Sequence, residues 1–419
     1  MHAQTTSCKT GVWIIGALGD IATTMIAGTL AIRHGLAGRI GLVSDLDPLD
    51  RLDLAPLETL VFGGIDIHGH NSGEPIARTI RAARAVAEQS RTLSPALLET
   101  IAPELERIDR DICSSPDFHW KSQGPVDTVP MLPEVIEQLR AHIRSFKARH
   151  DLDCVVAINL ASPEALPLPS SAWETLGAFE AALATNDRRV ISPSLAAAYA
   201  ALQEGCPYLN FTPNLGASIP ALKQLALQNQ LPFYGNDAKT GETLLKTVLA
   251  PMFAKRHLHI MSWEGINLLG NGDGKALAEP DRRESKLRNK SEILEKLMGY
   301  PLHSGVNINY VPSLGDWKNA WDLIHFKGFL DVPMTMQFTW QCYDSILAAP
   351  LALDMIRLAE FAVRHDEAGP MKHLASFFKN PLEVEELAFF PQFDDLLRYA
   401  RDHLARQETL GEVTQARGA

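Results

Sequence analysis

Polar residues gather in one stretch of the sequence, between residues 235 and 290, and their types suit the binding of an anion. The segment 235–243 reads Gly-Asn-Asp-Ala-Lys-Thr-Gly-Glu-Thr and runs into residues 240–255, which have the pattern of a helix. The first turn of a helix presents free backbone N–H groups and the positive end of the helix dipole, and both favour a phosphate. Thr240, Gly241 and Thr243 are therefore candidate phosphate ligands. If the segment around Lys286 and Lys290 is helical, these two cations share one face. An ordinary helix cap and a solvated charged face would have the same residue types.

Several motifs in a fixed order resemble the myo-inositol-1-phosphate synthase family, in particular its archaeal branch. They are Gly-Asn-Asp-Ala-Lys-Thr-Gly at 235–241, Leu-Gly-Asn-Gly-Asp-Gly at 269–274, and Ser285-Lys286 followed by Lys290. Further similar segments lie at 311–318, 325–329 and 344–350, so the resemblance covers most of the chain.

This resemblance implies an α/β fold with two parts. A Rossmann-type domain with a doubly wound parallel sheet is expected at residues 1–235 and 344–419. An inserted α+β domain for catalysis and tetramer contacts is expected at 236–343. Within the insert, the residue pattern predicts strands at 306–311 and 334–340 and a helix at 317–325.

The resemblance also implies a reaction in which NAD is a catalytic reagent and the overall chemistry is redox-neutral. A hexose 6-phosphate is oxidised at C5, loses a proton from C6, closes by an aldol reaction and takes the hydride back. D-glucose 6-phosphate is the expected substrate and 1D-myo-inositol 3-phosphate the expected product. Lysine ammonium groups in a dry pocket stabilise an enolate, and crowding lowers lysine pKa values so that one can act as a base. We assign Lys286, Lys318, Lys379 and Asp273 to catalysis and Lys290 to the phosphate.

The beginning of the chain has the strand, glycine turn and helix of a dinucleotide-binding unit. Residues 11–15 are an apolar run, and Gly16, Gly19 and Asp20 follow in the turn, although the usual third glycine is absent. A second strand is expected at 39–43, which would bring Asp45 to the ribose hydroxyls of NAD. An α/β unit without a nucleotide is the alternative. Further cofactor contacts are expected from Asn159, Ser162, Asp237, Asp316 and Asp344.

Two points stay open in the sequence. Asp237 and Asp273 could hold a divalent metal ion or a monovalent cation, as archaeal relatives suggest, or they could orient lysines. The family's Ser-Tyr-Asn is replaced by Glu-Gly-Ile-Asn at 264–267, and Trp317 precedes the catalytic-type lysine. A pocket reshaped by these residues would suit fructose 6-phosphate, with a five-membered cyclitol phosphate as the product. If Trp317 packs outward, glucose 6-phosphate remains the substrate.

Composition argues against several other classes of function. The formal net charge is −11, with 46% hydrophobic residues, which argues against a nucleic-acid partner. Five cysteines without CxxC spacing indicate neither a zinc site nor a disulfide framework, and they fit the cytoplasm. Asp20 and several glycines interrupt the apolar stretch at 11–30, so no membrane segment is expected.

The lysines argue against two other functions. A plain NAD-dependent dehydrogenase or a non-catalytic sugar-phosphate sensor would not need Lys286, Lys290, Lys318 and Lys379 together.

Overall fold

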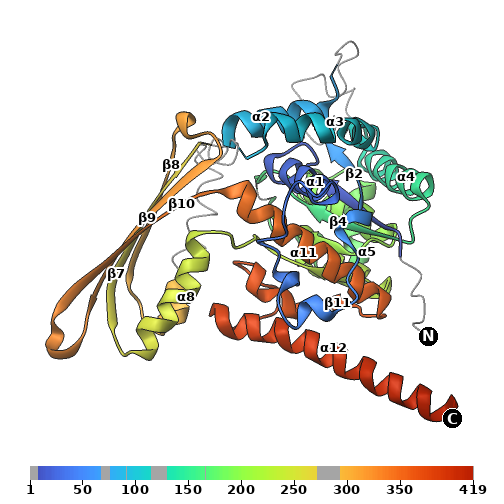
Figure 1. The fold of residues 1–419 in the computed structure, drawn as a ribbon. Coiled ribbons are helices and arrows are strands. Elements are labelled where there is room, and N and C mark those ends of the chain that lie inside the picture. Colours follow the sequence, from blue (N-terminus) through green and yellow to red (C-terminus); the bar gives the residue numbers. More distant parts are fainter. Residues whose placement is uncertain are drawn as a thin grey trace.

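Two sheets organise the chain in the structure, a computed structural model (Figure 1). One has seven strands, and the other is a separate four-stranded sheet at its side. The residues that the structure describes are 8–67, 76–90, 92–114, 130–165, 167–270 and 293–418, with side chains to residue 409. No helix in these segments is long and apolar enough to cross a membrane.

The seven-stranded sheet is parallel and has the strand order β11-β6-β5-β4-β1-β2-β3. Its strands are β1 (Thr10–Ile15), β2 (Val61–Asp66), β3 (Ile112–Ser114), β4 (Cys154–Asn159), β5 (Tyr208–Asn210), β6 (Pro232–Tyr234) and β11 (Gly369–Pro370). The order 3-2-1-4-5-6 is that of Rossmann sheets, in which ligands bind at the carboxyl ends of the strands, where the strand order reverses. That point lies between β1 and β4 here. The predicted α/β class with a doubly wound parallel sheet is therefore confirmed.

Helices cover both faces of this sheet because its strands are apolar on both sides. In β1, Val12 and Ile14 face one core, whereas Trp13 and Ile15 face the other. The first core includes α1 (Asp20–Arg33), α2 (Arg78–Ser90), α3 (Pro95–Asp109), α11 (Asp344–Arg364) and α12 (Phe389–Gly418). The second includes α4 (Leu132–His150), α5 (Leu176–Ala184), α6 (Pro193–Gln203) and α7 (Pro220–Gln228).

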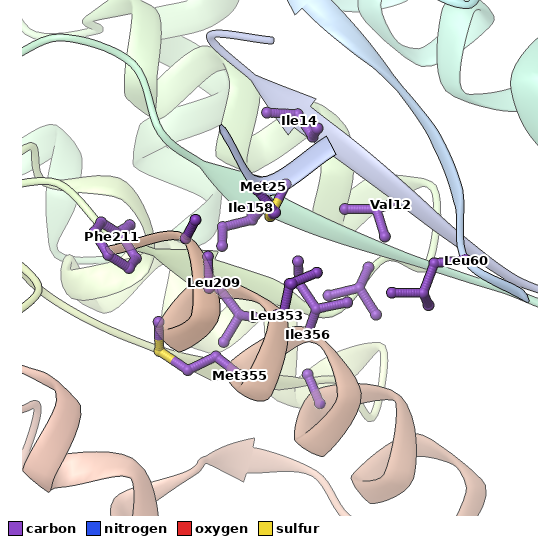
Figure 2. Close-up of a cluster of buried hydrophobic side chains, with 14 of the residues drawn as sticks. Val12, Ile14, Met25, Leu60, Ile158, Leu209, Phe211, Leu353, Met355 and Ile356 are labelled. Atoms are coloured by element: carbon purple, nitrogen blue, oxygen red, sulfur yellow. The ribbon is translucent and has the colours of Figure 1, made fainter. Parts of the chain in front are cut away.

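Packing in the first core fixes α11 on the sheet. Figure 2 shows Leu353 and Ile356 of α11 close to Ile158 and Leu209 of the sheet strands. All four side chains are at most 4% exposed. Truncating a leucine or isoleucine in such a core typically costs about 2–5 kcal/mol of stability. The tight packing also positions Asp344, the first residue of α11, at the carboxyl edge of the sheet.

The four-stranded sheet has the order β10-β9-β7-β8, formed by β7 (His259–Leu269), β8 (His303–Tyr310), β9 (Trp317–Lys327) and β10 (Pro333–Tyr343). The strands predicted at 306–311 and 334–340 correspond to β8 and β10. The helix predicted at 317–325 is wrong, because this segment is β9. Ala320, Asp322 and Ile324 are each 0% exposed, and the residues between them are partly exposed, which is the two-residue period of a strand. Backbone pairing with β7 on one side and β10 on the other completes the strand.

The two faces of this sheet differ. Helix α8 (Glu242–Lys255) lies along one face, where Phe253 packs with Trp263 and Ile324. On the opposite face, no described element covers the apolar side chains of the central strands. Those side chains are partly exposed and belong to Ile266, Leu268, Trp321 and Leu323.

The strand predicted at 39–43 is also wrong. Val43–Asp45 is a single 3₁₀ turn, and the second strand of the sheet is Val61–Asp66. The physical reason is exposure: Ile40 is fully exposed and only Leu42 of the segment 39–43 is buried, whereas an inner strand of this sheet is buried along its length. The backbone N–H groups of Val43 and Ser44 donate instead to the Asp354 carboxylate, at 2.7 and 3.2 Å.

Candidate active site

A cavity of about 360 Å³ brings together residues from both sheets. Its lining comes from segments that are far apart in the sequence. These are 18–21, 160–163, 211–213, 240–243 and 344–345, together with Asp237, Asp316, Lys318 and Lys379. These segments include the turn after β1, the loop after β4, the start of α8 and the start of α11. The cavity therefore lies at the carboxyl edge of the parallel sheet, where a Rossmann fold binds its ligands.

Lys318 and Asp344 form an ion pair inside this cavity. The Nζ atom of Lys318 lies 3.2 and 3.4 Å from the two carboxylate oxygens of Asp344. The hydroxyl of Thr240 donates to the same carboxylate at 3.3 Å. Burial is the largest influence and disfavours the ammonium form, but the charge and hydrogen bond of Asp344, together with Cys342 and Glu242, outweigh it, so the pKa of Lys318 is raised. The ammonium form of Lys318 is thus favoured inside the cavity.

Lys379 and Asp237 form a second pair, with Nζ 2.8 Å from the carboxylate oxygen Oδ1. Backbone hydrogen bonds hold the two residues together, because Lys379 N–H donates to the carbonyl of Asp237 at 2.7 Å. Asn236 and Asn380 exchange two further backbone bonds beside them. The position of the Lys379 ammonium is therefore fixed by main chain as well as by charge.

The N-terminus of α8 points into the same cavity. Gly241 is the residue before the helix, and a Cβ atom placed on it would lie 3.2 Å from Lys318 Nζ. A side chain at this position would therefore require the lysine ammonium to shift by a few tenths of an ångström. Thr240, Gly241 and Thr243 all line the cavity, as does Glu242. First-turn N–H groups, two hydroxyls and one ammonium make this corner suited to a phosphate.

The loops that would face a dinucleotide meet on the other side of the cavity. Gly16 has φ +86°, and a Cβ atom there would lie 2.8 Å from Cα of Ala161, so only glycine fits. Gly19, Asp20 and Ser162 line the cavity. Asn159 lies behind the loop, since its Oδ1 accepts the N–H of Ala161 at 3.1 Å. This close loop and the exposed turn before α1 fit a pyrophosphate.

The acid at the end of the second strand is Asp66. Its Oδ2 accepts the N–H of Leu18, a cavity residue, at 2.8 Å. Neither Asp66 nor Asp45 lines the cavity itself, and Arg39 donates to both carboxylate oxygens of Asp45, at 2.8 and 2.7 Å. Asp45 is predicted as the ribose acid because it follows the strand expected at 39–43. The sequence signal for Asp66 is an apolar run at 61–65 that ends in an acid.

Comparison with known proteins decides the family. A family model named for NAD binding and described as Myo-inositol-1-phosphate synthase matches residues 46–401. The chain belongs to the myo-inositol-1-phosphate synthase family. "Inositol-3-phosphate synthase 1" of Bacteroides thetaiotaomicron is 36% identical in an alignment of 396 positions, which covers 89% of this chain and 90% of that protein. Membership of this family makes the chain an enzyme of the inositol-3-phosphate synthase type, and the name of the family model points to NAD as cofactor.

Solved structures agree with this assignment to the myo-inositol-1-phosphate synthase family. The crystal structure of inositol-3-phosphate synthase from Caenorhabditis elegans has a TM-score of 0.81 at 25% identity and covers 94% of this chain and 86% of that one. A myo-inositol-1-phosphate synthase-related protein from Thermotoga maritima has a TM-score of 0.73 at 22% identity, with 93% and 98% covered. The second likeness supports the fold.

The remaining predicted residues of this synthase-family site are placed as follows. Asp316 lines the cavity and accepts the hydroxyl of Ser345 at 2.5 Å. Trp317 does not line it; its ring packs edge-on against Tyr343, with centroids 4.8 Å apart. Its indole N–H donates to Asn319 at 3.3 Å. Lys286, Lys290 and Asp273 lie outside the described residues.

A metal site is not apparent in the described segments, which contain no group of three His, Cys, Asp or Glu side chains that could hold an ion. Asp237, one of the two predicted ligands, faces Lys379. Two cavity residues that the sequence reasoning did not select are Glu242 and Asn267. Both stand inside or beside the recognised motifs, but nothing in their spacing indicates a shared role.

Proposed function

We propose that the chain catalyses the NAD-dependent, redox-neutral aldol cyclisation of a hexose 6-phosphate, namely D-glucose 6-phosphate to 1D-myo-inositol 3-phosphate. The observation that carries the proposal is the meeting of two lysine–aspartate pairs, a helix N-terminus and a dinucleotide-type loop in one cavity. Simple hydride transfer requires one base. Two lysines held by separate carboxylates suit a reaction that also moves a C6 proton and stabilises an enolate.

The phosphate is assigned to the start of α8. Thr240, Gly241 and Thr243 would bind it with hydroxyl and N–H groups, and Lys290 is predicted to add a cation. Lys318 lies beside Gly241, as the 3.2 Å approach to its Cβ position indicates. Because C6 carries the phosphate, a group beside the phosphate is within reach of C5 and C6. We therefore assign the Lys318 ammonium to the negative charge that develops on the C5 oxygen.

Proton transfer is assigned to Lys379. Asp237 and the neighbouring backbone hold its amine in one position, 2.8 Å from the carboxylate. A positioned general acid or base contributes roughly 10²–10⁴-fold to the rate. Lys286 and Asp273 stay predictions for the same reaction.

The cofactor is assigned to the turn after β1 and to the loop after β4. Gly16, Gly19 and Asp20 would approach the pyrophosphate, and Ser162 would lie on the nicotinamide side. Asp66 replaces Asp45 as the proposed acceptor for the ribose hydroxyls. When bound there, NAD would supply a reversible hydride acceptor for the oxidation at C5. Asp316 and Asp344 are assigned to hydrogen bonds within the protein. Asp316 accepts from the hydroxyl of Ser345, and Asp344 accepts from the ammonium of Lys318.

The test is product analysis with purified protein and NAD, supplied separately with glucose 6-phosphate and fructose 6-phosphate. Formation of an inositol phosphate from glucose 6-phosphate without net NADH, seen by NMR and absorbance, is the expected result. A cyclopentane product from fructose 6-phosphate would show instead that the substrate is the ketose phosphate. Steady NADH release with an open-chain product would refute both. Repeating the assay with a chelator and with added divalent or monovalent cations tests the metal requirement.

We further propose that residues 236–343 form the catalytic insert and that its uncovered sheet face is the contact in a homotetramer. The partly exposed side chains of Ile266, Leu268, Trp321 and Leu323 support this, because monomers rarely leave such a stripe open to water. Light scattering on the purified protein tests it. Replacing Leu323 by lysine should give smaller assemblies, and an unchanged mass would contradict the proposal.

A further inference from the structure

A buried ion pair lies beside the proposed phosphate corner. Glu242, in the first turn of α8, faces Lys246 one turn later, with Oε1 2.7 Å from Nζ. Their side chains are only 2% and 1% exposed. The ammonium also lies 5.9 Å from the centre of the Trp263 ring. The pair places the Glu242 carboxylate directly against the Lys246 side chain, inside the protein.

The second carboxylate oxygen of Glu242 accepts a hydrogen bond from the side-chain amide of Asn267 in β7. An ionised carboxylate has no hydrogen to donate, so only the NH₂ end of the amide can face it. This contact sets the orientation of the Asn267 side chain. Its carbonyl oxygen, Oδ1, must point away from Glu242.

The Oδ1 atom of Asn267 is left without a hydrogen-bond partner in the described part of the chain. The residue is 2% exposed and lines the cavity. A buried carbonyl oxygen without a donor is unfavourable, and such exceptions point to a missing partner. The partner must be a donor, because the atom can only accept.

Gly265 makes room for this arrangement. A Cβ atom at Gly265 would lie 2.8 Å from Oε1 of Glu242 and 3.2 Å from Oδ1 of Asp322. Asp322 in turn accepts the indole N–H of Trp263 at 2.7 Å. The carboxylate that orients Asn267 can therefore stay in place only while position 265 lacks a side chain.

We propose that Oδ1 of Asn267 accepts a hydrogen bond from one hydroxyl of the sugar phosphate, and that Glu242 and Lys246 are positioning residues that fix the amide for it. This inference rests on the proposed function, because Glu242, Asn267 and Thr243 line the same cavity. A sugar anchored by its phosphate at α8 would extend past Asn267. The site then selects substrates that carry a donor at one particular carbon.

The test uses deoxy and deoxyfluoro analogues of glucose 6-phosphate, altered one at a time at carbons 2, 3 and 4. Binding is measured calorimetrically with NAD present, and kcat/KM is measured for those analogues that react. At one carbon, both analogues should bind about 5- to 150-fold more weakly than the parent, because an acceptor is left unpaired and fluorine cannot donate. In Asn267→Leu this penalty should shrink to about twofold or less, as a double-mutant cycle requires.

Three outcomes would overturn the inference: restored affinity with the fluoro analogues, penalties that persist unchanged in Asn267→Leu, or no carbon that shows a penalty. Asn229→Leu makes the same change at the exposed end of α7 and should leave every ratio unchanged. If glucose 6-phosphate binds but is not cyclised, the proposed function fails. The affinity ratios between parent and analogues still test the role of Asn267 in that case. If no sugar phosphate binds, both fail.

The positioning role is tested in the double variant Glu242→Gln with Lys246→Met, which leaves no unpaired buried charge. Glutamine can donate or accept, so the Asn267 amide can reverse. We expect the discrimination between parent and deoxy analogue to fall severalfold while NAD affinity stays unchanged. A purely structural role would instead lower the unfolding temperature and leave the discrimination as in the natural protein, which would contradict the proposal.

Discussion

Replacing Asp66 by asparagine is expected to weaken NAD binding, whereas the same change at Asp45 is expected to leave it unchanged. Asp66 ends β2, which lies beside β1, and Rossmann sheets bind the ribose with the acid at this position. Its carboxylate accepts the N–H of Leu18 at 2.8 Å, and Leu18 lines the cavity. Asp45 instead accepts hydrogen bonds from Arg39 at both of its carboxylate oxygens.

The magnitude follows from charge and burial. Asp66 is 8% exposed, so a ribose hydroxyl that donates to it makes a charge-assisted bond with little competition from water. Hydrogen bonds to charged groups contribute roughly 1.5–3 kcal/mol each. Losing one should therefore raise the Kd for NAD about 10- to 150-fold. Asparagine keeps an oxygen for Leu18, so the loop should retain its conformation. It also removes a negative charge, so the preference for NAD over NADP should fall.

Calorimetric titration of NAD and NADP into both variants and the natural protein gives the comparison. Urea unfolding of each variant serves as the folding control. Asp45→Asn breaks a partly exposed salt bridge with Arg39, which is worth at most about 1 kcal/mol of stability. If Asp66→Asn binds NAD normally, or if Asp45→Asn binds it much more weakly, the assignment of the second strand's acid to the ribose is refuted.

Three further predictions concern catalysis, pH and packing. Lys379→Met should lower kcat/KM roughly 10²–10⁴-fold without changing the Kd for NAD, whereas Lys372→Met, at a lysine that is 53% exposed, should have no effect; equal kinetics in both would remove Lys379 from the mechanism. Burial lowers the pKa of Lys239 to about 7, below about 10.4 in the unfolded chain. Between these values the unfolded state binds more protons, so the unfolding free energy should rise with pH by up to about 1.4 kcal/mol per unit. Urea unfolding of Lys239→Met should show higher stability below pH ~7 and no such rise. Gly64→Ala would place a Cβ 2.1 Å from a backbone oxygen of the neighbouring strand and should cost at least about 1–3 kcal/mol in thermal unfolding; Gly28→Ala in α1, with no atom within 4 Å, should stabilise by up to about 1 kcal/mol.

The parallel sheet could be predicted because its strands carry their own signal. The apolar runs at 11–15 and 155–160 are short and end in glycine or polar residues, as buried parallel strands do. The segment around Ile40 gave a false strand, since nothing in its composition reveals that Ile40 would be fully exposed. β9 was mistaken for a helix because its buried residues include Asp322, which a hydrophobic pattern counts as an outward position. Its partners in the fold, β7 and β10, determine its conformation.

The candidate site shows a deeper limit, because motifs identify lysines but not their partners. Lys318 is 26 residues from Asp344, and Lys379 is 142 residues from Asp237, so no local spacing predicts either pair. The partner of each lysine nevertheless influences the pKa of its amine. Asp344 raises the pKa of Lys318 despite its burial. Lys239 stands next to the phosphate motif in sequence, yet its amine donates to the neutral Gln392 at 3.0 Å, and burial lowers its pKa to about 7. Lys318 and Lys239 thus differ in electrostatic role because their partners differ, and only the folded chain determines those partners.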